Sequence, residues 1–420
     1  MNSVRAVRTI FLLPLVFLFF AALDGAYAYT FSVLYTFQGG KDGAGPYGHL
    51  VRDNAGNLYG ATFDGGGGCQ SEFDYGCGTA YKLAPDGTET VLRAFGTKLR
   101  GDGHFPSSGL VEDKAGNFHG TTDFGGGKKG CGGVGCGTVF ILGPDGTERV
   151  LHHFTGADGR SPTGLAQDSA GNLYGTSYSE GNDGCGGEGC GLVFKVAPDG
   201  TDTTLYVFQG GSDGANPDAP LIRDKAGNLY GTTELGGGGN VGQCDEQPPL
   251  GCGTVFKLTT DGTETVLYAF SGGSDGGYPS ARLAMDSAGN LYGAAGGGAF
   301  GYGVVFKLTP AGVETVLYSF KGGSDGAYAG PVGFLDGSAS LYGTSDGGGT
   351  GCGGGGCGTV FRLAADGTKT ILHVFTGGAD GAVPESALIA DKAGNIYGTA
   401  DVGGGPGCSE GCGVVFKLTP

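Results

Sequence analysis

Seven aspartates at one repeated position are the first side chains in this sequence that could do chemistry. Each begins an Asp-Gly pair in a recurring pattern of the form Gly-Gly-Ser-Asp-Gly-Ala-x-Pro: Asp42, Asp102, Asp158, Asp213, Asp275, Asp325 and Asp380. A ring of carboxylates could bind Ca²⁺ or a cationic ligand. The alternative is a turn whose Asp side chain accepts backbone N–H bonds. Because a single ligand site seldom uses every repeat equally, the regular recurrence favours the turn.

The 12 cysteines form six closely spaced pairs, each in a glycine-rich loop. The pairs are Cys69/Cys77, Cys131/Cys136, Cys185/Cys190, Cys244/Cys252, Cys352/Cys357 and Cys408/Cys412. The loop of the fifth repeat lacks both cysteines, and presence or absence as a pair is what a disulfide inside each loop produces. Zinc and iron–sulfur sites need about four ligands, and no His recurs beside the pairs. The spacing therefore predicts disulfides in an exported protein.

A ligand site is expected where the repeats differ from one another. The longest loop, 236–253, carries Asp245 and Glu246, and the cysteine-free loop of the next repeat carries Phe300 and Tyr302. Together these four residues are predicted to form an asymmetric ligand-binding lip. The alternative is that the loops have drifted without function.

No catalytic constellation is present, and we assign no catalytic residues. The 6 histidines share no repeat position, and three of them, His119, His152 and His373, replace a Tyr of the repeat. There is no nucleophile elbow, phosphate loop or His-Glu zinc motif. The glycine runs are not nucleotide loops, because no helix follows them. The only cofactor considered is therefore the Ca²⁺ that the aspartate ring could hold.

All of these residues lie at fixed distances from a marker motif, which at 224–233 reads Asp-Lys-Ala-Gly-Asn-Leu-Tyr-Gly-Thr-Thr. Its Asn recurs at Asn57, Asn117, Asn172, Asn228, Asn290 and Asn395, and Ser340 takes that place in a degraded copy. The marker Asp is predicted to be a turn residue. Seven units of about 56 residues follow, and short β runs at such a period are typical of propeller blades.

One unit contains four β candidates. They are Pro220 to Arg223, Asn228 to Thr233, Gly253 to Thr259 and Thr263 to Phe270. The Asp261-Gly262 pair between the last two is a strong hairpin signal, because Gly tolerates the positive φ of a tight turn. The seven Asp-Gly pairs that begin with Asp42 and its counterparts lie in crossovers, the segments that join the fourth strand of one unit to the first strand of the next. This strand order places the cysteine loops and these crossovers on the same face.

The two ends of the chain predict how the ring closes. Phe31 to Phe37 has the sequence of a fourth strand, and Gly413 to Leu418 has that of a third. The N-terminal strand should therefore complete the last blade and leave no unpaired edge there. We predict an all-β protein, a seven-bladed β-propeller of four-stranded blades, with residues 29–420 as a single domain.

The repeated motifs resemble the GloVer (Gloeo-Verruco) tandem repeat of bacteria. The resemblance rests on Asp-x-Ala-Gly-Asn-Leu-Tyr-Gly-Thr, Gly-Thr-Val-Phe-Lys-Leu and Asp-Gly-Thr-Glu-Thr-Val-Leu-Tyr, and extends from Phe31 to Leu418. It implies an exported propeller without an assigned activity. The marker turn also resembles that of gluconolactonase-like propellers, which implies a fold and not a chemistry.

The N-terminus predicts export. Arg5 and Arg8 precede the apolar stretch from Ile10 to Leu23, and Ala26-Tyr27-Ala28 suits cleavage. We therefore predict a signal peptide over residues 1–28 and a secreted or periplasmic protein with no membrane span after cleavage; a retained anchor is the alternative. The formal net charge of −17, without a basic cluster, argues against nucleic-acid binding. We expect a monomer.

Two classes of function remain open from the sequence. The leading hypothesis is a non-catalytic exported propeller that binds a protein, glycan or envelope component through the rim carrying the cysteine loops. The alternative is a metal-assisted lactonase, lyase or hydrolase with its site at the axial channel; a purely structural surface protein is a third. A cluster of unlike polar residues from several blades around the axis would favour the alternative.

Overall fold

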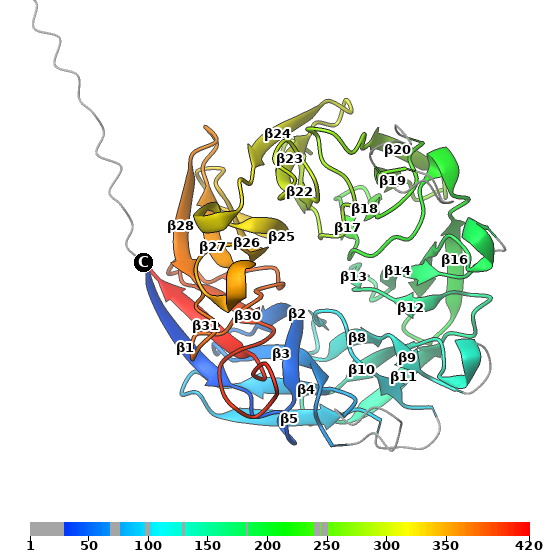
Figure 1. Cartoon of the computed structure of the whole chain (residues 1–420). Helices are drawn as coiled ribbons and strands as arrows, with labels where there is room; N and C mark the ends of the chain where they lie inside the picture. Colours follow the sequence, from blue (N-terminus) through cyan, green and yellow to red (C-terminus); the bar gives the residue numbers. More distant parts are fainter. Residues whose placement is uncertain are drawn as a thin grey trace, which may run out of the picture.

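The computed structural model describes residues 29–67, 76–96, 101–127, 131–181, 184–238, 244 and 251–420, which form a ring of seven blades around a central channel (Figure 1). Each blade is an antiparallel sheet whose first strand lies nearest the channel and whose fourth strand is outermost. The predicted seven-bladed β-propeller is therefore confirmed.

Blades are numbered here in chain order, with their strands named from the channel outwards. Blade 1 consists of β2 (Ala44–Arg52), β3 (Leu58–Asp64), β4 (Thr79–Leu83) and β5 (Glu89–Ala94). Blade 2 consists of β7 (Val111–Glu112), β8 (Phe118–Thr122), β10 (Thr138–Leu142) and β11 (Glu148–His153). In blade 3 the innermost strand is split, giving β12 (Arg160–Pro162), β13 (Ala166–Gln167), β14 (Leu173–Ser179), β15 (Leu192–Val196) and β16 (Asp202–Val207).

The remaining blades repeat this pattern. Blade 4 consists of β17 (Ile222–Arg223), β18 (Leu229–Thr233), β19 (Thr254–Leu258) and β20 (Glu264–Ala269). Blade 5 consists of β21 (Ala284–Met285), β22 (Leu291–Ala295), β23 (Val304–Leu308) and β24 (Glu314–Ser319). Blade 6 consists of β25 (Ala327–Leu335), β26 (Leu341–Gly347), β27 (Thr359–Leu363) and β28 (Lys369–Val374). Blade 7 consists of β29 (Ile389–Ala390), β30 (Ile396–Ala400), β31 (Val414–Thr419) and β1 (Thr30–Thr36).

Only short elements lie outside the blades. A two-stranded ribbon pairs β6 (Gly103–His104) with β9 (Phe124–Gly125). Five 3-10 turns complete the described elements: η1 (Cys131–Gly133), η2 (Cys185–Gly187), η3 (Gly211–Asp213), η4 (Gly323–Asp325) and η5 (Cys352–Gly354). No helix in the described residues is long and apolar enough to cross a membrane.

The ring is closed by the first strand, as the sequence predicts. β1 pairs antiparallel with β31, placing Thr30 opposite Thr419 and Phe31 opposite Leu418. In Figure 1 the blue β1 lies along the red β31 on the outer edge of blade 7. The four β candidates of the unit at 220–270 also agree with β17 to β20 to within two residues at each end.

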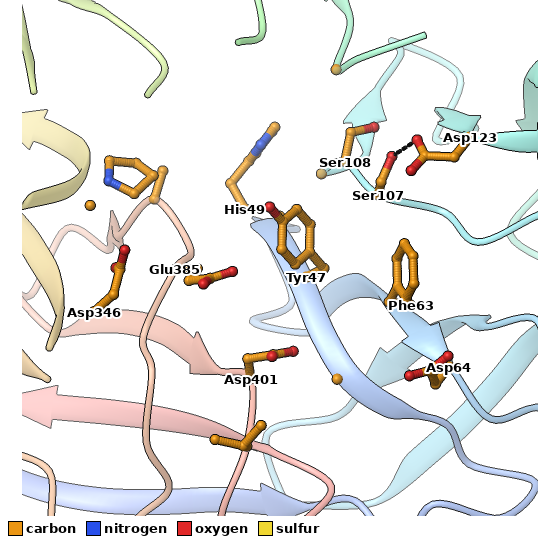
Figure 2. A pocket seen from close by; sticks show the side chains of 18 of the residues that line it. Tyr47, His49, Phe63, Asp64, Ser107, Ser108, Asp123, Asp346, Glu385 and Asp401 are labelled. Atoms are coloured by element: carbon orange, nitrogen blue, oxygen red, sulfur yellow. Dashed lines mark hydrogen bonds between the residues drawn. The ribbon is translucent and has the colours of Figure 1, made fainter. Parts of the chain in front are cut away.

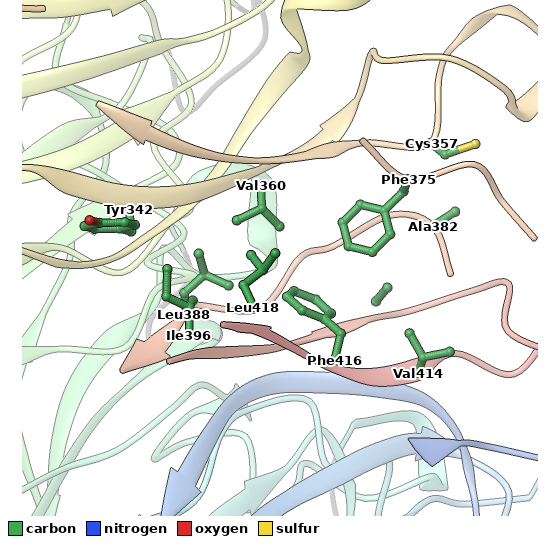
Figure 3. Packing of buried hydrophobic residues seen from close by; sticks show 11 residues of the cluster. Tyr342, Cys357, Val360, Phe375, Ala382, Leu388, Ile396, Val414, Phe416 and Leu418 are labelled. Atoms are coloured by element: carbon green, nitrogen blue, oxygen red, sulfur yellow. The ribbon is translucent and has the colours of Figure 1, made fainter. Parts of the chain in front are cut away.

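Aromatic pairs fill the spaces between blades. A buried Phe that follows each outermost strand meets an aromatic ring on the third strand of the next blade, with ring centroids 5.0 to 5.4 Å apart. The pairs are Phe37–Tyr81, Phe95–Phe140, Phe154–Phe194, Phe208–Phe256, Phe270–Phe306, Phe320–Phe361 and Phe375–Phe416. Figure 3 shows the last of these among the aliphatic residues of blades 6 and 7. Each core cluster thus joins two neighbouring blades.

The marker motif forms the turn between the first two strands. In blade 4, Asp224 accepts hydrogen bonds from the Asn228 backbone N–H (2.9 Å), the Asn228 amide (2.7 Å) and the Tyr230 hydroxyl (3.2 Å). These bonds hold the pKa of Asp224 below its usual value. The degraded copy keeps the turn, because Asp336 accepts from the backbone N–H groups of Ser338 and Ser340. The marker organises the fold, as predicted.

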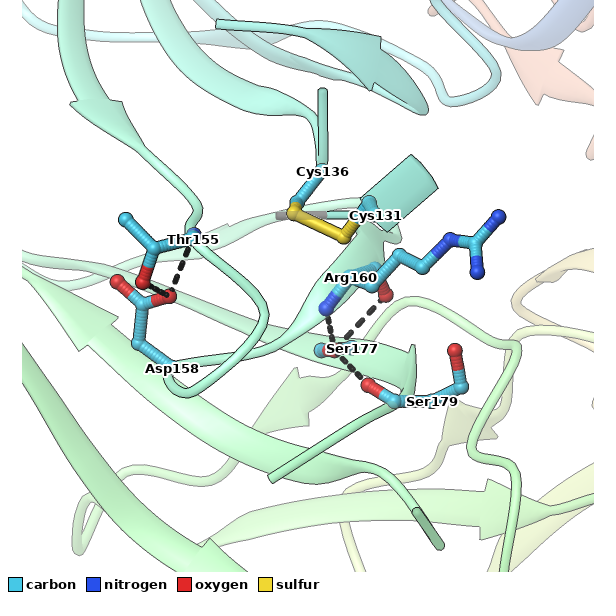
Figure 4. The surroundings of a disulfide bond; sticks show 7 residues. All are labelled: Cys131, Cys136, Thr155, Asp158, Arg160, Ser177 and Ser179. Carbon is cyan, nitrogen blue, oxygen red and sulfur yellow. Dashed lines mark hydrogen bonds between the residues drawn. A yellow bond between two sulfur atoms is a disulfide. The ribbon is translucent and has the colours of Figure 1, made fainter. Parts of the chain in front are cut away.

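Disulfides form within the cysteine loops. Five bridges are present, Cys131–Cys136, Cys185–Cys190, Cys244–Cys252, Cys352–Cys357 and Cys408–Cys412. Cys77 is also disulfide-bonded, while Cys69 lies outside the described residues. Figure 4 shows the first bridge beside the crossover that carries Asp158. The disulfide prediction is therefore confirmed for the described pairs.

Candidate functional site

The seven crossover aspartates lie at seven separate blade junctions, each beside an outermost strand. Asp213, for example, accepts hydrogen bonds from the Tyr206 hydroxyl (2.6 Å) and the Gln209 backbone N–H (2.6 Å). Equivalent pairs of bonds hold Asp42, Asp275 and Asp325, and at Asp158 and Asp380 a His replaces the Tyr. Asp102 instead pairs with Arg93 at 2.8 Å. In each case the carboxylate stabilises its own crossover.

One of these junctions gathers three groups that could hold a metal ion. The ligand atoms of His152, Asp158 and Asp202 all lie within 4.8 Å of one another, and no other such group occurs in the described part of the chain. Both His152 and Asp202 belong to outermost strands, so this junction is remote from the channel. An imidazole with two carboxylates suits a transition metal better than Ca²⁺, which prefers oxygen ligands alone.

The predicted lip is described only in part. Asp245 and Glu246 lie outside the described residues. Phe300 and Tyr302 are 54% and 40% exposed on the loop between β22 and β23. The structure adds Tyr328, which is 57% exposed, with its ring centroid 6.4 Å from that of Tyr302. The rings of Tyr302 and Tyr328 form an aromatic patch, and Ala329, the residue after Tyr328, lines a larger cavity.

That cavity is an axial pocket of about 1200 Å³ at the centre of the ring, opening on the cysteine-loop face (Figure 2). Part of its wall comes from the innermost strands, with Tyr47 in β2 and Thr163 between β12 and β13, and from crossovers that precede first strands, with Ser107, Asp218 and Glu385. Another part comes from the second strands, each of which contributes the residue that follows its last pairing with the third strand: Phe63, Asp123, Tyr178, Asp346 and Asp401.

Four carboxyls from blades 6, 7 and 1 face one part of the pocket. Burial, reinforced by Glu385, raises the pKa of Asp346 to about 8, and burial with Asp401 nearby raises that of Glu385 to about 7. Burial and the neighbouring Asp64 raise the pKa of Asp401 to about 6, and burial also raises that of Asp64. One oxygen of Asp346, Oδ1, is buried without a hydrogen-bond partner in the described residues. At neutral pH this group of carboxyls therefore retains protons.

A second acidic group comes from blades 2, 3 and 4. Burial raises the pKa of Asp123 to about 6, although the Ser107 hydroxyl donates a hydrogen bond to it. Burial and the charge of Glu234 raise the pKa of Asp218 to about 7. Asp218 itself is exposed to the solvent of the pocket, so hydration opposes this shift. Tyr178 donates a hydrogen bond to Glu234 (3.1 Å), linking blades 3 and 4.

Tyr47 lies between the two acidic groups, and two basic residues, His49 and Arg282, lie below it at the floor of the pocket. Burial and the charges of Glu385, Asp218, Asp401 and Asp123 raise the pKa of the Tyr47 phenol. His49 and Arg282 line both the axial pocket and a smaller cavity of about 470 Å³ further down the channel. Burial and the charge of Arg282 lower the pKa of His49 to about 3, so this imidazole is neutral. The site thus has acidic walls and a cationic floor.

The sequence pointed to the axial channel as the alternative place for a site but to none of its residues, although a signal for them existed. When the repeats are aligned on the second strand, the residue after a recurring Thr, Ser or Ala reads Phe63, Asp123, Tyr178, Glu234, Gly296, Asp346 and Asp401. This position varies in chemistry while its neighbours repeat. The structure brings these unlike side chains from several blades to one axis, which is the feature that favours a site at the channel.

Together these features define a disulfide-bonded β-propeller with an axial pocket. The chain belongs to the Gloeobacter/Verrucomicrobia repeat family, whose model matches residues 22–244, 129–356 and 245–420. No match was found among curated protein sequences.

Solved structures of the same fold include two lyases and the extracellular domain of a putative one-component system. Virginiamycin B lyase from Staphylococcus aureus aligns with a TM-score of 0.60 at 13% identity, covering 93% of this chain and 99% of that one. A streptogramin B lyase aligns at 0.58 and 13% identity, covering 93% and 97%. The extracellular domain of a putative one-component system from B. thetaiotaomicron aligns at 0.55 and 10% identity, covering 92% and 39%. At these identities the likeness is one of fold.

Proposed function

We propose that this protein is an exported binding protein whose ligand enters the axial pocket from the cysteine-loop face and carries a cationic group. The observation that carries the proposal is the convergence of carboxyls from blades 1, 2, 4, 6 and 7 on one cavity, where desolvation raises their pKa values. The disulfides agree with an exported protein. The proposed signal peptide, residues 1–28, lies outside the described residues.

Electrostatics explains why a cation would be favoured. Several carboxyls crowded in a poorly hydrated cavity cannot all ionise, so they hold protons in the empty pocket. A bound ammonium group would replace those protons and meet carboxylate oxygens such as the unpartnered Oδ1 of Asp346. The phenol of Tyr47 and the exposed rings of the aromatic patch could add cation–π contacts. Binding should therefore release protons.

Titration calorimetry with an alkylamine such as hexylamine tests this proposal. We expect binding to the intact protein at pH 7, with a heat that depends on the ionisation enthalpy of the buffer because protons are released. The paired change Asp346→Asn and Glu385→Gln should weaken binding at least tenfold. Asp86→Asn, on an exposed hairpin, is the matched control and should change nothing. An amine affinity that the pocket variants leave intact would overturn the proposal.

Acid–base catalysis in the same pocket is a second candidate function. Its support is that carboxyls with pKa values near 6 to 8 can donate protons at neutral pH, as a general acid must. Ser107, bonded to Asp123, supplies a hydroxyl beside such a group. Two proteins of similar fold are lyases, which makes lyase and ester or lactone substrates a reasonable first panel.

The catalytic candidate has its own test. Hydrolysis or elimination in such a panel, abolished by Asp123→Asn but retained in Asp86→Asn, would support it. Including a chelator in one arm tests whether a metal ion takes part, and metal analysis of the His152→Ala variant tests the junction of His152, Asp158 and Asp202. Turnover that persists in Asp123→Asn would remove this residue from the mechanism.

A further inference from the structure

We propose that Arg282 binds an anionic group of the same ligand, so that the axial pocket takes a zwitterion: its oxyanion on the floor and its amine against the carboxyls. This inference rests on the proposed function, because it adds a second anchor to the cation-binding pocket. The two binding groups together define the ligand as a zwitterion, which neither Arg282 nor the carboxyls would define alone.

Arg282 is a cation without a protein partner. Within the described residues it forms no salt bridge, and its Nε is buried without a hydrogen-bond partner. Burial lowers its pKa. The smaller cavity below it has a mixed lining, which includes Val51, Leu110 and Glu112, but Glu112 forms no ion pair or hydrogen bond with Arg282. The guanidinium therefore has unused donors facing the channel.

Two other buried cations of the described chain have carboxylate partners, unlike Arg282. Arg93 bridges Asp102 at 2.8 Å and Glu148 at 2.7 Å. Lys369, whose side chain is 3% exposed, pairs with Asp325 at 3.3 Å. A buried charge without a partner is unfavourable, because it has lost hydration and gained no compensating interaction. Because the fold provides carboxylate partners for Arg93 and Lys369, the missing partner of Arg282 points to a bound ligand.

The carboxyls of the pocket wall form no ion pair with Arg282, because they lie higher in the channel. Arg282 lines both cavities, whereas Asp123, Asp218, Asp346, Glu385 and Asp401 line only the upper one. A ligand that meets both must span from the floor to the wall. A planar guanidinium accepts a carboxylate or a phosphate in a two-pronged hydrogen bond. The shared chemistry of the lower anchor is thus an oxyanion.

Binding of linear ω-amino acids, from glycine to 6-aminohexanoate, tests this inference on the intact protein at pH 7. Each is compared with the alkylamine and the alkanoate of equal length. We expect at least one length to bind tenfold more tightly than its amine, and Arg282→Met to lower it to the affinity of the amine without changing the amine itself. Comparing β-alanine with 2-aminoethylphosphonate distinguishes a carboxylate from a phosphate-like oxyanion.

Two further variants keep the test decisive. Arg282→Lys keeps the charge and should retain part of the gain even if Arg282→Met folds poorly. Arg149→Met, exposed on the outermost strand of blade 2, is the matched control and should leave every affinity unchanged. If amino acid and amine bind equally, or Arg282→Met has no effect, the zwitterion is excluded while the cation pocket stands. If neither amines nor amino acids bind, both proposals fail.

Discussion

The raised pKa of one carboxyl, that of Asp346, couples protonation of the pocket to the stability of the fold. Its folded pKa of about 8 lies well above the ordinary value of an aspartate, so the folded protein binds this proton more tightly than the unfolded chain does. Stability from this group is therefore present at low pH and is lost as the pH rises from about 4 to about 8. The same desolvation that disfavours the bare carboxylate, and so keeps the proton bound, also favours a cation beside the carboxylate oxygen.

Asp346→Asn should remove this pH dependence. Asn resembles the protonated carboxyl in shape, so the variant should lose little stability at pH 5 and gain on the wild type as the pH rises, by at most about 1.4 kcal/mol per pH unit. Calorimetric melting from pH 5 to 8 measures the difference. Asp366→Asn is the control, because that exposed carboxyl has a lowered pKa and should give a constant difference. Parallel curves for wild type and Asp346→Asn would contradict the assignment.

Residue identity alone could not reveal this role. Asp346 occupies a position that holds Phe63 in blade 1 and Gly296 in blade 5, so in the sequence it looks like tolerated variation. Its pKa is raised first by burial and then by the charge of Glu385 from the next blade, and both conditions exist only in the folded protein. Phe300 and Tyr302 could be singled out because their loop lacks the cysteine pair of the other repeats, whereas Tyr328 belongs to a different repeat.

At the scale of elements, the blade junctions vary one arrangement. A crossover Asp faces the first residue of the next outermost strand, which is Glu89, Glu264 or Glu314 at three junctions. Burial and the facing Asp raise the pKa of each of these glutamates to about 7. The remaining junctions vary in this residue or in its partner. At one, Arg93 bridges Asp102 and Glu148, and at another, His152 contacts Asp158 near Asp202. At the last two, Lys369 pairs with Asp325 and Phe31 stacks on His373.

Glu314→Lys should copy the junction of Lys369. The wild-type glutamate stabilises the fold below pH 4.5, and its contribution is lost as the pH rises through about 7, because its folded pKa is raised. A lysine there would instead pair with Asp275. We expect the melting temperature of the variant, relative to wild type, to rise between pH 5 and pH 8. Glu188→Lys, an exposed change of equal charge, is the control. An equal rise in both variants would mean that net charge alone is responsible.

The cysteine loops are a second repeated element, and their disulfides pack on the crossovers. A Cβ added to Gly377 would lie 2.6 Å from the Sγ of Cys352, so the crossover needs glycine where it passes over the bridge. Replacing Cys352 and Cys357 together by Ala should cost about 2 kcal/mol, the chain-entropy value for so short a loop. Blade 5 folds without a bridge, so we expect the ring to persist, with only a lower melting temperature by calorimetry. Loss of all cooperative unfolding would contradict this.

For the whole molecule, the repeated pattern made the fold predictable. It did not indicate which residues form the axial pocket. Seven copies of one strand pattern define seven blades, and the out-of-phase ends, Phe31 to Phe37 and Gly413 to Leu418, define how the ring closes. Each relation is local or repeated, so sequence is sufficient. The axial pocket depends on which single residues of distant repeats meet at the axis, and no periodic pattern encodes that meeting.

Ring closure itself can be tested by moving the closing strand. Thr30 lies opposite Thr419, so residues 30–37 can be placed after Pro420 through an Asp-Gly turn like Asp261-Gly262, which joins the third and fourth strands of blade 4. This permuted chain should melt within a few degrees of the wild type by calorimetry. Simple deletion of residues 30–37 should instead expose the edge of β31 and unpair Tyr81 from Phe37, a loss of at least about 3 kcal/mol. A deletion variant as stable as the permuted chain would show that β1 does not close the ring.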